Sequence, residues 1–122
     1  MALTALTPML RTADIPGTIG FYTSVLGFDC ESYNQALGWA SLRHGPIRLM
    51  ISGLNTHEGD QAPIFTGSFY FTVDDVDALW NQLKEGAKVC YELETFDYGM
   101  REFAIYDNNG YLLQFGQEVL LD

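Results

Sequence analysis

Leu10-Arg11-Thr12-Ala13-Asp14-Ile15 returns about 60 residues later as Phe71-Thr72-Val73-Asp74-Asp75-Val76. In both stretches a short strand-forming run leads into an aspartate that begins a helical pattern. The spacing is half the length of the 122-residue chain. Similarity at such a spacing indicates that one structural unit is built twice. We therefore expect a single domain of two modules, residues 1 to about 60 and about 61 to 122.

Each aspartate is placed to cap a helix. Asp14 is a good N-cap, and Pro16 falls in the first turn, where a missing N–H costs nothing. Gly27 marks the end of this first helix. In the second module, Asp74 or Asp75 caps a helix that ends before Gly86. Its apolar stripe has helical spacing and consists of Val76, Leu79, Trp80 and Leu83.

Strand-like segments follow each helix and pair as hairpins. Residues 39–42 and 47–52 flank a turn containing Gly45. Residues 101–106 and 111–115 flank a turn that ends in Asn-Gly, a pair that tolerates positive φ. Each module therefore reads strand, helix and three strands, and residues 55–67 connect the two modules. Neither half has enough core to stand alone, so we expect an α+β fold in which the modules pack as one unit.

The composition is strongly acidic. Sixteen Asp and Glu residues outnumber six Lys and Arg residues, which gives a formal charge of −10. Such a field repels phosphate backbones, so nucleic acid and anionic membrane surfaces are not expected partners. The charge can serve solubility alone, or it can belong to a cleft that attracts a cationic ligand. Composition does not choose between these two.

Nothing in the sequence predicts a secretory signal or a membrane span. The first ten residues lack basic side chains, and the uncharged run 15–28 is too short and too rich in glycine to cross a bilayer. Cys30 and Cys90 lack the paired spacing of zinc or redox motifs. We interpret them as reduced thiols of a cytoplasmic protein, with a disulfide between them as the alternative.

The pattern resembles the vicinal oxygen chelate superfamily, which includes glyoxalase I, extradiol dioxygenases and the fosfomycin- and bleomycin-resistance proteins. The motifs that carry the resemblance are residues 14–15 with 21–28, and residues 99–104 with 107–111. The second motif, together with Pro8 and residues 49–52, is most similar to the bleomycin-resistance branch. The resemblance implies two tandem βαβββ modules that form a concave, partly open mixed sheet, in a homodimer.

Enzymes of this superfamily hold a divalent metal with His and Glu side chains on four cavity-facing strands. The motifs carry these four positions onto Thr7, Met50, Ser68 and Gln114. Neutral donors of these kinds are weak ligands for Mg, Mn, Fe or Zn. His44 lies in a predicted turn and His57 in the connector, and neither restores the set. We therefore expect no metal and no cofactor.

Catalysis is left as the alternative. Glu102 is the one acidic residue on a strand that looks internal, so it could act as a base, or it could pair with Arg101 or a neighbouring chain. A metal site displaced onto Glu102, His57 or Glu58 would make the protein a glyoxalase-like lyase or a dioxygenase.

Strand alternation predicts the surface that contacts a ligand. Ile47, Leu49 and Ile51 should face the helices, as should Leu113 and Phe115, and the residues between them should face the concave side. Trp39 and Tyr98 are candidate stacking platforms, although core or dimer-interface packing would also suit them. The predicted ligand-contacting residues are Trp39, Arg48, Met50, Ser68, Tyr70, Tyr98, Glu102 and Gln114.

The resemblance also implies a role. Proteins of the bleomycin-resistance branch bind the cationic drug without metal chemistry, in grooves of an acidic homodimer that commonly exchanges N-terminal strands at a proline. Pro8 matches that proline, whereas Tyr98 stands where the branch usually has Trp. The expected function is metal-free binding of a small molecule, either a bleomycin-like cationic antibiotic or an unidentified compound.

Overall fold

Both modules have the predicted order of elements. The computed structural model describes residues 1–55, 59, 62–64 and 67–120. The chain divides into two compact units, Met1–Ala62 and Pro63–Asp122. Each unit contains a strand, a helix and three further strands. The prediction of an α+β fold with tandem βαβββ modules is therefore confirmed.

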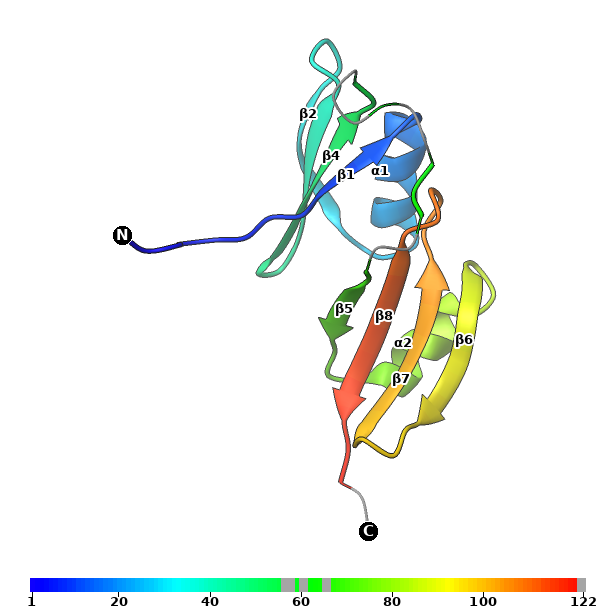
Figure 1. Cartoon of the computed structure of the whole chain (residues 1–122). Coiled ribbons are helices and arrows are strands. Elements are labelled where there is room, and N and C mark those ends of the chain that lie inside the picture. The colour runs from blue at the N-terminus through cyan, green and yellow to red at the C-terminus, as the bar shows by residue number, and fades with distance from the viewer. Residues whose placement is uncertain (56–58, 60–61, 65–66, 121–122) are drawn as a thin grey trace. The chain divides into compact units, whose positions relative to one another are not determined.

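The two units share one sheet topology (Figure 1). In each, the first strand is parallel to the fourth, and the second and third strands pair antiparallel beyond it. The strand orders are β1-β4-β3-β2 and β5-β8-β7-β6. The first unit consists of β1 (Met9–Thr12), α1 (Ile15–Ser24), β2 (Asp29–Asn34), β3 (Trp39–His44) and β4 (Ile47–Gly53). The second consists of β5 (Phe69–Thr72), α2 (Val76–Leu83), β6 (Lys88–Thr95), β7 (Met100–Tyr106) and β8 (Leu112–Glu118).

The helix caps follow the aspartates of the repeated motif. The Asp14 carboxylate accepts a hydrogen bond from the Gly17 backbone N–H at 3.0 Å. In the second unit it is Asp75, one of the two predicted candidates, that accepts from the Ala78 N–H at 3.1 Å. These caps satisfy N–H groups that have no partner inside the helix.

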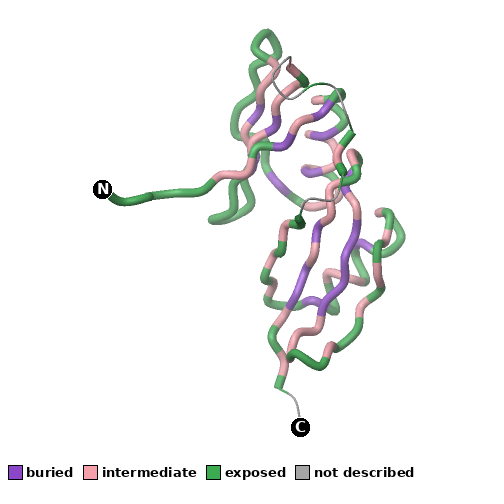
Figure 2. The backbone as a smooth tube through the Cα atoms, viewed as in Figure 1, coloured by how far each residue is buried: buried purple, intermediate pink, exposed green. Residues whose placement is uncertain are grey.

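The core of the second unit is a layer of aromatic rings between the sheet and α2. Phe103 on β7 stacks on Phe115 of β8 with centroids 5.2 Å apart, and Phe71 of β5 stacks on the far side of Phe115 at 5.2 Å. Trp80 of α2 lies 5.1 Å from Phe103. Figure 2 shows the buried residues running along the middle strands β7 and β8. Apolar burial on this side fixes which face of the sheet meets the helix.

The core of the first unit confirms most of the predicted alternation and corrects one position. Leu49 and Ile51 of β4 are buried, as are Leu10 and Leu42 on neighbouring strands. Ile47 is 40% exposed, although the alternation placed it against the helix. It is the first residue of β4, beside the turn at Gly45, and this strand end extends past the packed part of the sheet.

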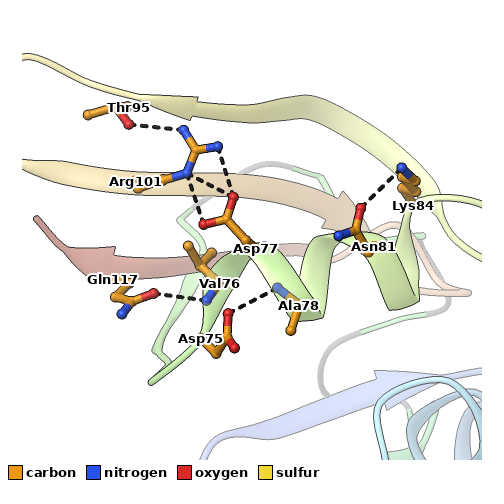
Figure 3. A network of polar contacts seen from close by, with 9 residues as sticks. All are labelled: Asp75, Val76, Asp77, Ala78, Asn81, Lys84, Thr95, Arg101 and Gln117. Carbon is orange, nitrogen blue, oxygen red and sulfur yellow. Dashed lines mark hydrogen bonds and ion pairs between the residues drawn. The ribbon is translucent and has the colours of Figure 1, made fainter.

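Polar contacts hold α2 on its sheet (Figure 3). The Arg101 guanidinium of β7 contacts the Asp77 carboxylate at 2.9 Å and also donates to the Thr95 hydroxyl at 3.0 Å. The Gln117 side chain of β8 accepts from the Val76 N–H at the start of α2, at 2.9 Å. Arg101 and Gln117 therefore point to the helix side of the sheet.

No helix among the described residues has the length and apolar character needed to cross a membrane.

Replacement of Asp107 by Ala should destabilise the β7–β8 hairpin. The Asp107 carboxylate, in a residue that is 6% exposed, accepts from the backbone N–H groups of Asn109 and Tyr111 at 2.8 and 2.9 Å. The variant removes the acceptor of both bonds, so we expect the free energy of unfolding to fall by about 1–3 kcal/mol. Urea unfolding followed by circular dichroism measures the change. Asp97→Ala, the same change at an exposed turn residue, should have a much smaller effect, and equal effects would contradict the prediction.

Candidate functional site

The face of the second sheet opposite α2 carries polar and aromatic side chains. Because neighbours along a strand point to opposite faces, Glu102 points away from the side that holds Arg101 and Phe103. Tyr70 of β5 and Gln114 of β8 are paired in register and share the face of Glu102. We call this surface, with Tyr70, Tyr91, Glu102 and Gln114, the tyrosine face. The predicted alternative of a salt bridge between Glu102 and Arg101 is therefore wrong.

Glu102 is the centre of the tyrosine face. Its residue is only 2% exposed, and its carboxylate accepts hydrogen bonds from three phenols. The Tyr70 and Tyr98 hydroxyls donate to Oε1 at 3.0 and 2.6 Å, and the Tyr91 hydroxyl donates to Oε2. A buried carboxylate is costly unless donors compensate its charge, and three O–H groups supply that compensation.

The hydrogen bonds continue beyond Tyr91 as a chain across the sheet. The Gln114 side-chain amide donates to the Tyr91 hydroxyl oxygen at 2.9 Å. The Ser68 hydroxyl donates to the Gln114 carbonyl oxygen. The chain joins β5, β8, β6 and β7, and we call its residues together the Glu102 cluster: Ser68, Tyr70, Tyr91, Tyr98, Glu102 and Gln114.

Gly116 gives Tyr70 its route to Glu102. Tyr70 lies on β5, and Glu102 lies on β7, with β8 between them. Gly116 of β8 is the register partner of Glu102. A Cβ atom at Gly116 would lie 1.9 Å from the Tyr70 hydroxyl oxygen and 2.6 Å from its Cζ. The Tyr70 ring therefore crosses β8 over a position that only glycine leaves open.

Tyr98 reaches the cluster from the turn between β6 and β7. Its ring stacks on Phe96 with centroids 5.4 Å apart and an interplanar angle of 6°, and Phe96 in turn meets the Tyr91 ring edge-on at 5.8 Å. Gly99, at φ +89°, reverses the chain after Tyr98. Tyr98 is nonetheless 62% exposed, so its ring is both oriented and accessible.

The cluster keeps its phenols protonated. Burial, followed by the hydrogen bond to Glu102, raises the pKa of Tyr70 to about 12. The hydrogen bond to Glu102, followed by burial, raises the pKa of Tyr98 to about 12. Burial and the same carboxylate raise the pKa of Tyr91 as well. Ionised phenols beside a carboxylate would repel it, so the hydroxyls remain donors throughout the physiological range.

The equivalent face of the first sheet holds the other predicted residues. Trp39 is paired with Ser52, and Arg48 with Arg43, which places Trp39, Arg48 and Met50 on the face opposite α1. Arg48 is not available as an isolated cation, because its guanidinium lies 3.6 Å from the Glu31 carboxylate. Thr7, in the segment before β1, is half-buried. These residues belong to the first unit, and the Glu102 cluster belongs to the second.

The structure thus brings together five of the eight predicted ligand-contacting residues: Ser68, Tyr70, Tyr98, Glu102 and Gln114. Sequence reasoning missed Tyr91, Phe96 and Gly116. The signal for Tyr91 was its place in an alternating strand, residues 88–95, which pairs with the strand of Glu102. For Gly116 the signal was a glycine in the middle of a strand, which marks a close approach by another group.

The donor set does not fit a divalent metal. Of the four positions carried over from the superfamily, Thr7, Met50, Ser68 and Gln114 offer only neutral donors. The Gln114 carbonyl oxygen already accepts a hydrogen bond from Ser68. Within the described ranges, no three His, Cys, Asp or Glu side chains gather closely enough to hold a metal. His57 and Glu58, named for a displaced site, lie outside the described residues.

A comparison with models of protein families identifies one family. The model of the glyoxalase/bleomycin resistance protein/dioxygenase superfamily matches residues 4–115. A search of curated protein sequences finds no match. Among solved structures, a protein of unknown function from Agrobacterium tumefaciens str. C58 has a TM-score of 0.81 at 20% identity, over 98% of this chain and 97% of that one.

Two further solved structures have the same fold. A glyoxalase/bleomycin resistance protein/dioxygenase from Nocardioides has a TM-score of 0.77 at 16% identity, over 98% of this chain and 85% of its own. TioX from Micromonospora sp. ML1 has a TM-score of 0.75 at 19% identity, over 95% of this chain and 99% of that one. At these identities the likeness concerns the fold, and function must be argued from the site.

Gly116→Ala should detach Tyr70 from Glu102. The added methyl group would occupy the place of the Tyr70 hydroxyl, and this hydroxyl would turn towards water. Because burial and Glu102 together raise the pKa of Tyr70 to about 12, we expect that pKa to fall towards its ordinary value near 10. Ultraviolet titration of tyrosine absorbance measures the shift, with Tyr70→Phe in the same background to assign it.

The matched control is Gly86→Ala. A Cβ atom at Gly86 would meet nothing within 4 Å, so this variant adds the same methyl group without displacing a side chain. An unchanged tyrosine titration in Gly116→Ala, identical to that of Gly86→Ala, would show that Tyr70 does not depend on the open position.

Proposed function

Since this chain belongs to the glyoxalase/bleomycin resistance protein/dioxygenase superfamily, we propose that it binds a small molecule without metal chemistry. The observation that carries the proposal is the Glu102 cluster, a buried carboxylate surrounded by three phenols on the sheet face opposite the helix. Small-molecule sites combine apolar and aromatic walls with a few fixed polar groups, and this cluster has that composition.

A neighbouring hollow supports this role. Ser68, the outer member of the hydrogen-bond chain, also lines a pocket of about 470 Å³ together with Phe69, Tyr106, Tyr111 and Leu112. A volume of this order suits a small organic ligand. A ligand held at the Glu102 cluster could therefore extend along β5 and β8 into a pocket with both aromatic and polar lining groups.

A bleomycin-like cationic antibiotic is the specific ligand that we propose. The formal charge of −10 attracts cations over long range, and the exposed Tyr98 ring offers a stacking surface for a planar group.

Both free cysteines, Cys30 and Cys90, are exposed, which suits a protein kept in the reducing cytoplasm.

Homodimerisation, with exchange of N-terminal strands, is part of the same proposal. Leu3 and Leu6 precede β1 and are 91% and 93% exposed. A second copy of the chain would bury these apolar side chains, with Pro8 at the point where the segment leaves β1. Light scattering at micromolar concentration should then give the mass of two chains.

Isothermal titration with metal-free bleomycin tests the proposed ligand. We expect saturable heat at micromolar concentrations, and we expect Glu102→Gln to weaken binding because it removes the buried charge. Glu85→Gln makes the same change of net charge at an exposed position and should bind like the unmodified protein. Absence of heat would eliminate bleomycin as the ligand, and equal weakening by both variants would show that net charge alone attracts it.

A glyoxalase-like lyase or dioxygenase is the second candidate, because Glu102 is a buried carboxylate in a superfamily that includes enzymes. Its oxygens are already engaged by three phenols, however, which is a poor arrangement for abstracting a proton.

Elemental analysis of protein purified without chelators distinguishes the two candidates. We expect less than stoichiometric Ni, Zn, Fe and Mn, because the available donors are neutral. Tyrosine titration before and after treatment with a chelator should be identical. One metal ion per chain, lost together with activity in Glu102→Gln, would establish the displaced site instead.

A further inference from the structure

The hydrogen bonds of the Glu102 cluster all run in one direction. A carboxylate can only accept, so each phenol that contacts Glu102 must use its single O–H proton there. The Tyr91 oxygen must then accept from the Gln114 amide N–H, which turns the Gln114 carbonyl oxygen towards Ser68. Ser68 in turn donates its proton. The hydroxyl protons of the cluster are all used internally and lead towards Glu102.

The groups left for a ligand are therefore acceptors. Each hydroxyl oxygen keeps a lone pair after its proton is committed. Tyr98 is 62% exposed and Tyr70 is 42% exposed, so of the three phenols bonded to Glu102 these two belong to the exposed residues. Their acceptor strength is increased by the carboxylate behind them, since hydrogen bonds in a chain polarise one another. At these two phenols a ligand meets lone pairs rather than hydrogen-bond donors.

Among the described residues of its own unit, no basic side chain forms an ion pair with the carboxylate behind these oxygens. The second unit has three basic residues. Arg101 pairs with Asp77 on the opposite side of the sheet, and Lys84 contacts Asn81 on α2. Lys88 lies over the Tyr106 ring at 5.4 Å. Among the described ion pairs, none involves Glu102.

We propose that the Glu102 cluster on the tyrosine face selects a flat cation with several N–H donors, an amidinium or guanidinium group, through the phenol oxygens of Tyr70 and Tyr98. This rests on the proposed function, a small-molecule site at the Glu102 cluster. The cation would satisfy the exposed lone pairs and complete the charge balance of the buried carboxylate, although it need not touch Glu102 itself. The Tyr98 ring, oriented by its stack on Phe96, favours a planar group.

Three probes of nearly the same shape test this selection: benzamidine is a cation with N–H donors, benzamide is neutral, and benzoate is an anion that only accepts. Chemical-shift titration of the ¹⁵N-labelled full chain should show benzamidine binding at least about tenfold more tightly than benzamide, and no binding of benzoate. The shifts should concentrate on β5, β7, β8 and the turn before Gly99.

Two variants connect the selection to the cluster. In Glu102→Gln the benzamidine-to-benzamide affinity ratio should fall to about one, because the buried charge is gone and the hydrogen-bond directions are no longer imposed. Tyr98→Phe removes one accessible oxygen at a largely exposed position and should lower the ratio partially, with the fold intact. Glu85→Gln, with the same change of net charge, should keep the ratio of the unmodified protein.

The outcomes separate this inference from the proposed function. Equal affinities for the three probes, tighter binding of benzoate, or no binding of benzamidine would each refute the donor-selecting face. If bleomycin gives saturable binding heat but the probes give any of these results, the proposed small-molecule role remains. Benzamidine selectivity that depends on Glu102, without bleomycin heat, would support the selected chemical group and remove the antibiotic as the ligand.

Discussion

The burial of the Glu102 carboxylate is the constraint on which the second module's polar face depends. A charge with 2% exposure would be prohibitively unstable among apolar neighbours, and none of the ion pairs among the described residues includes it. Phenols supplied by β5, β6 and the β6–β7 turn compensate it instead. The β6–β7 hairpin and the more distant strand β5, whose Tyr70 is 32 residues from Glu102, must therefore be in place at once. The site is ordered only when the sheet is formed.

Two glycines make that compensation possible. Gly116 leaves space over β8, so that a side chain from β5 reaches a residue on β7. Gly99 adopts φ +89° directly after Tyr98, and its carbonyl accepts from the Val119 N–H at 2.9 Å. The first glycine acts through the absence of a side chain and the second through its backbone conformation. Substitution at either position would change the site without replacing one of its polar side chains.

Local signals predicted the fold, whereas the site needed long-range information. The repeated aspartates, Asp14 and Asp75, are helix caps because capping depends on only a few neighbouring residues. Alternation also placed Ser68, Tyr70 and Gln114 on one face, because β5 and β8 pair without irregularity. The family model and the solved structures support the same fold.

Tyr91 shows why sequence reasoning stopped short. Two register shifts interrupt the pairing of β6 with β7, one on each side of Tyr91, so its neighbours across the sheet could not be counted from the hairpin turn. The sequence left the role of Glu102 open: it could be a base, or it could pair with Arg101 or with a neighbouring chain. Alternation places these adjacent residues on opposite faces, and the contact of Arg101 with Asp77 of α2 shows which of the two faces the helix.

The two modules, each considered by itself, show how one topology carries opposite chemistry. Register places Arg11, Arg43 and Arg48 on the face of the first sheet opposite its helix, where Glu31 neutralises part of their charge. The corresponding face of the second sheet has the buried Glu102 and no basic residue in contact with it. Half of the six basic residues thus lie on one sheet face, although the chain carries a net charge of −10. A uniform acidic field is therefore a poor description of this protein. Any preference for a cation has to arise from the directed hydrogen bonds of the second module, with the net charge adding only long-range attraction.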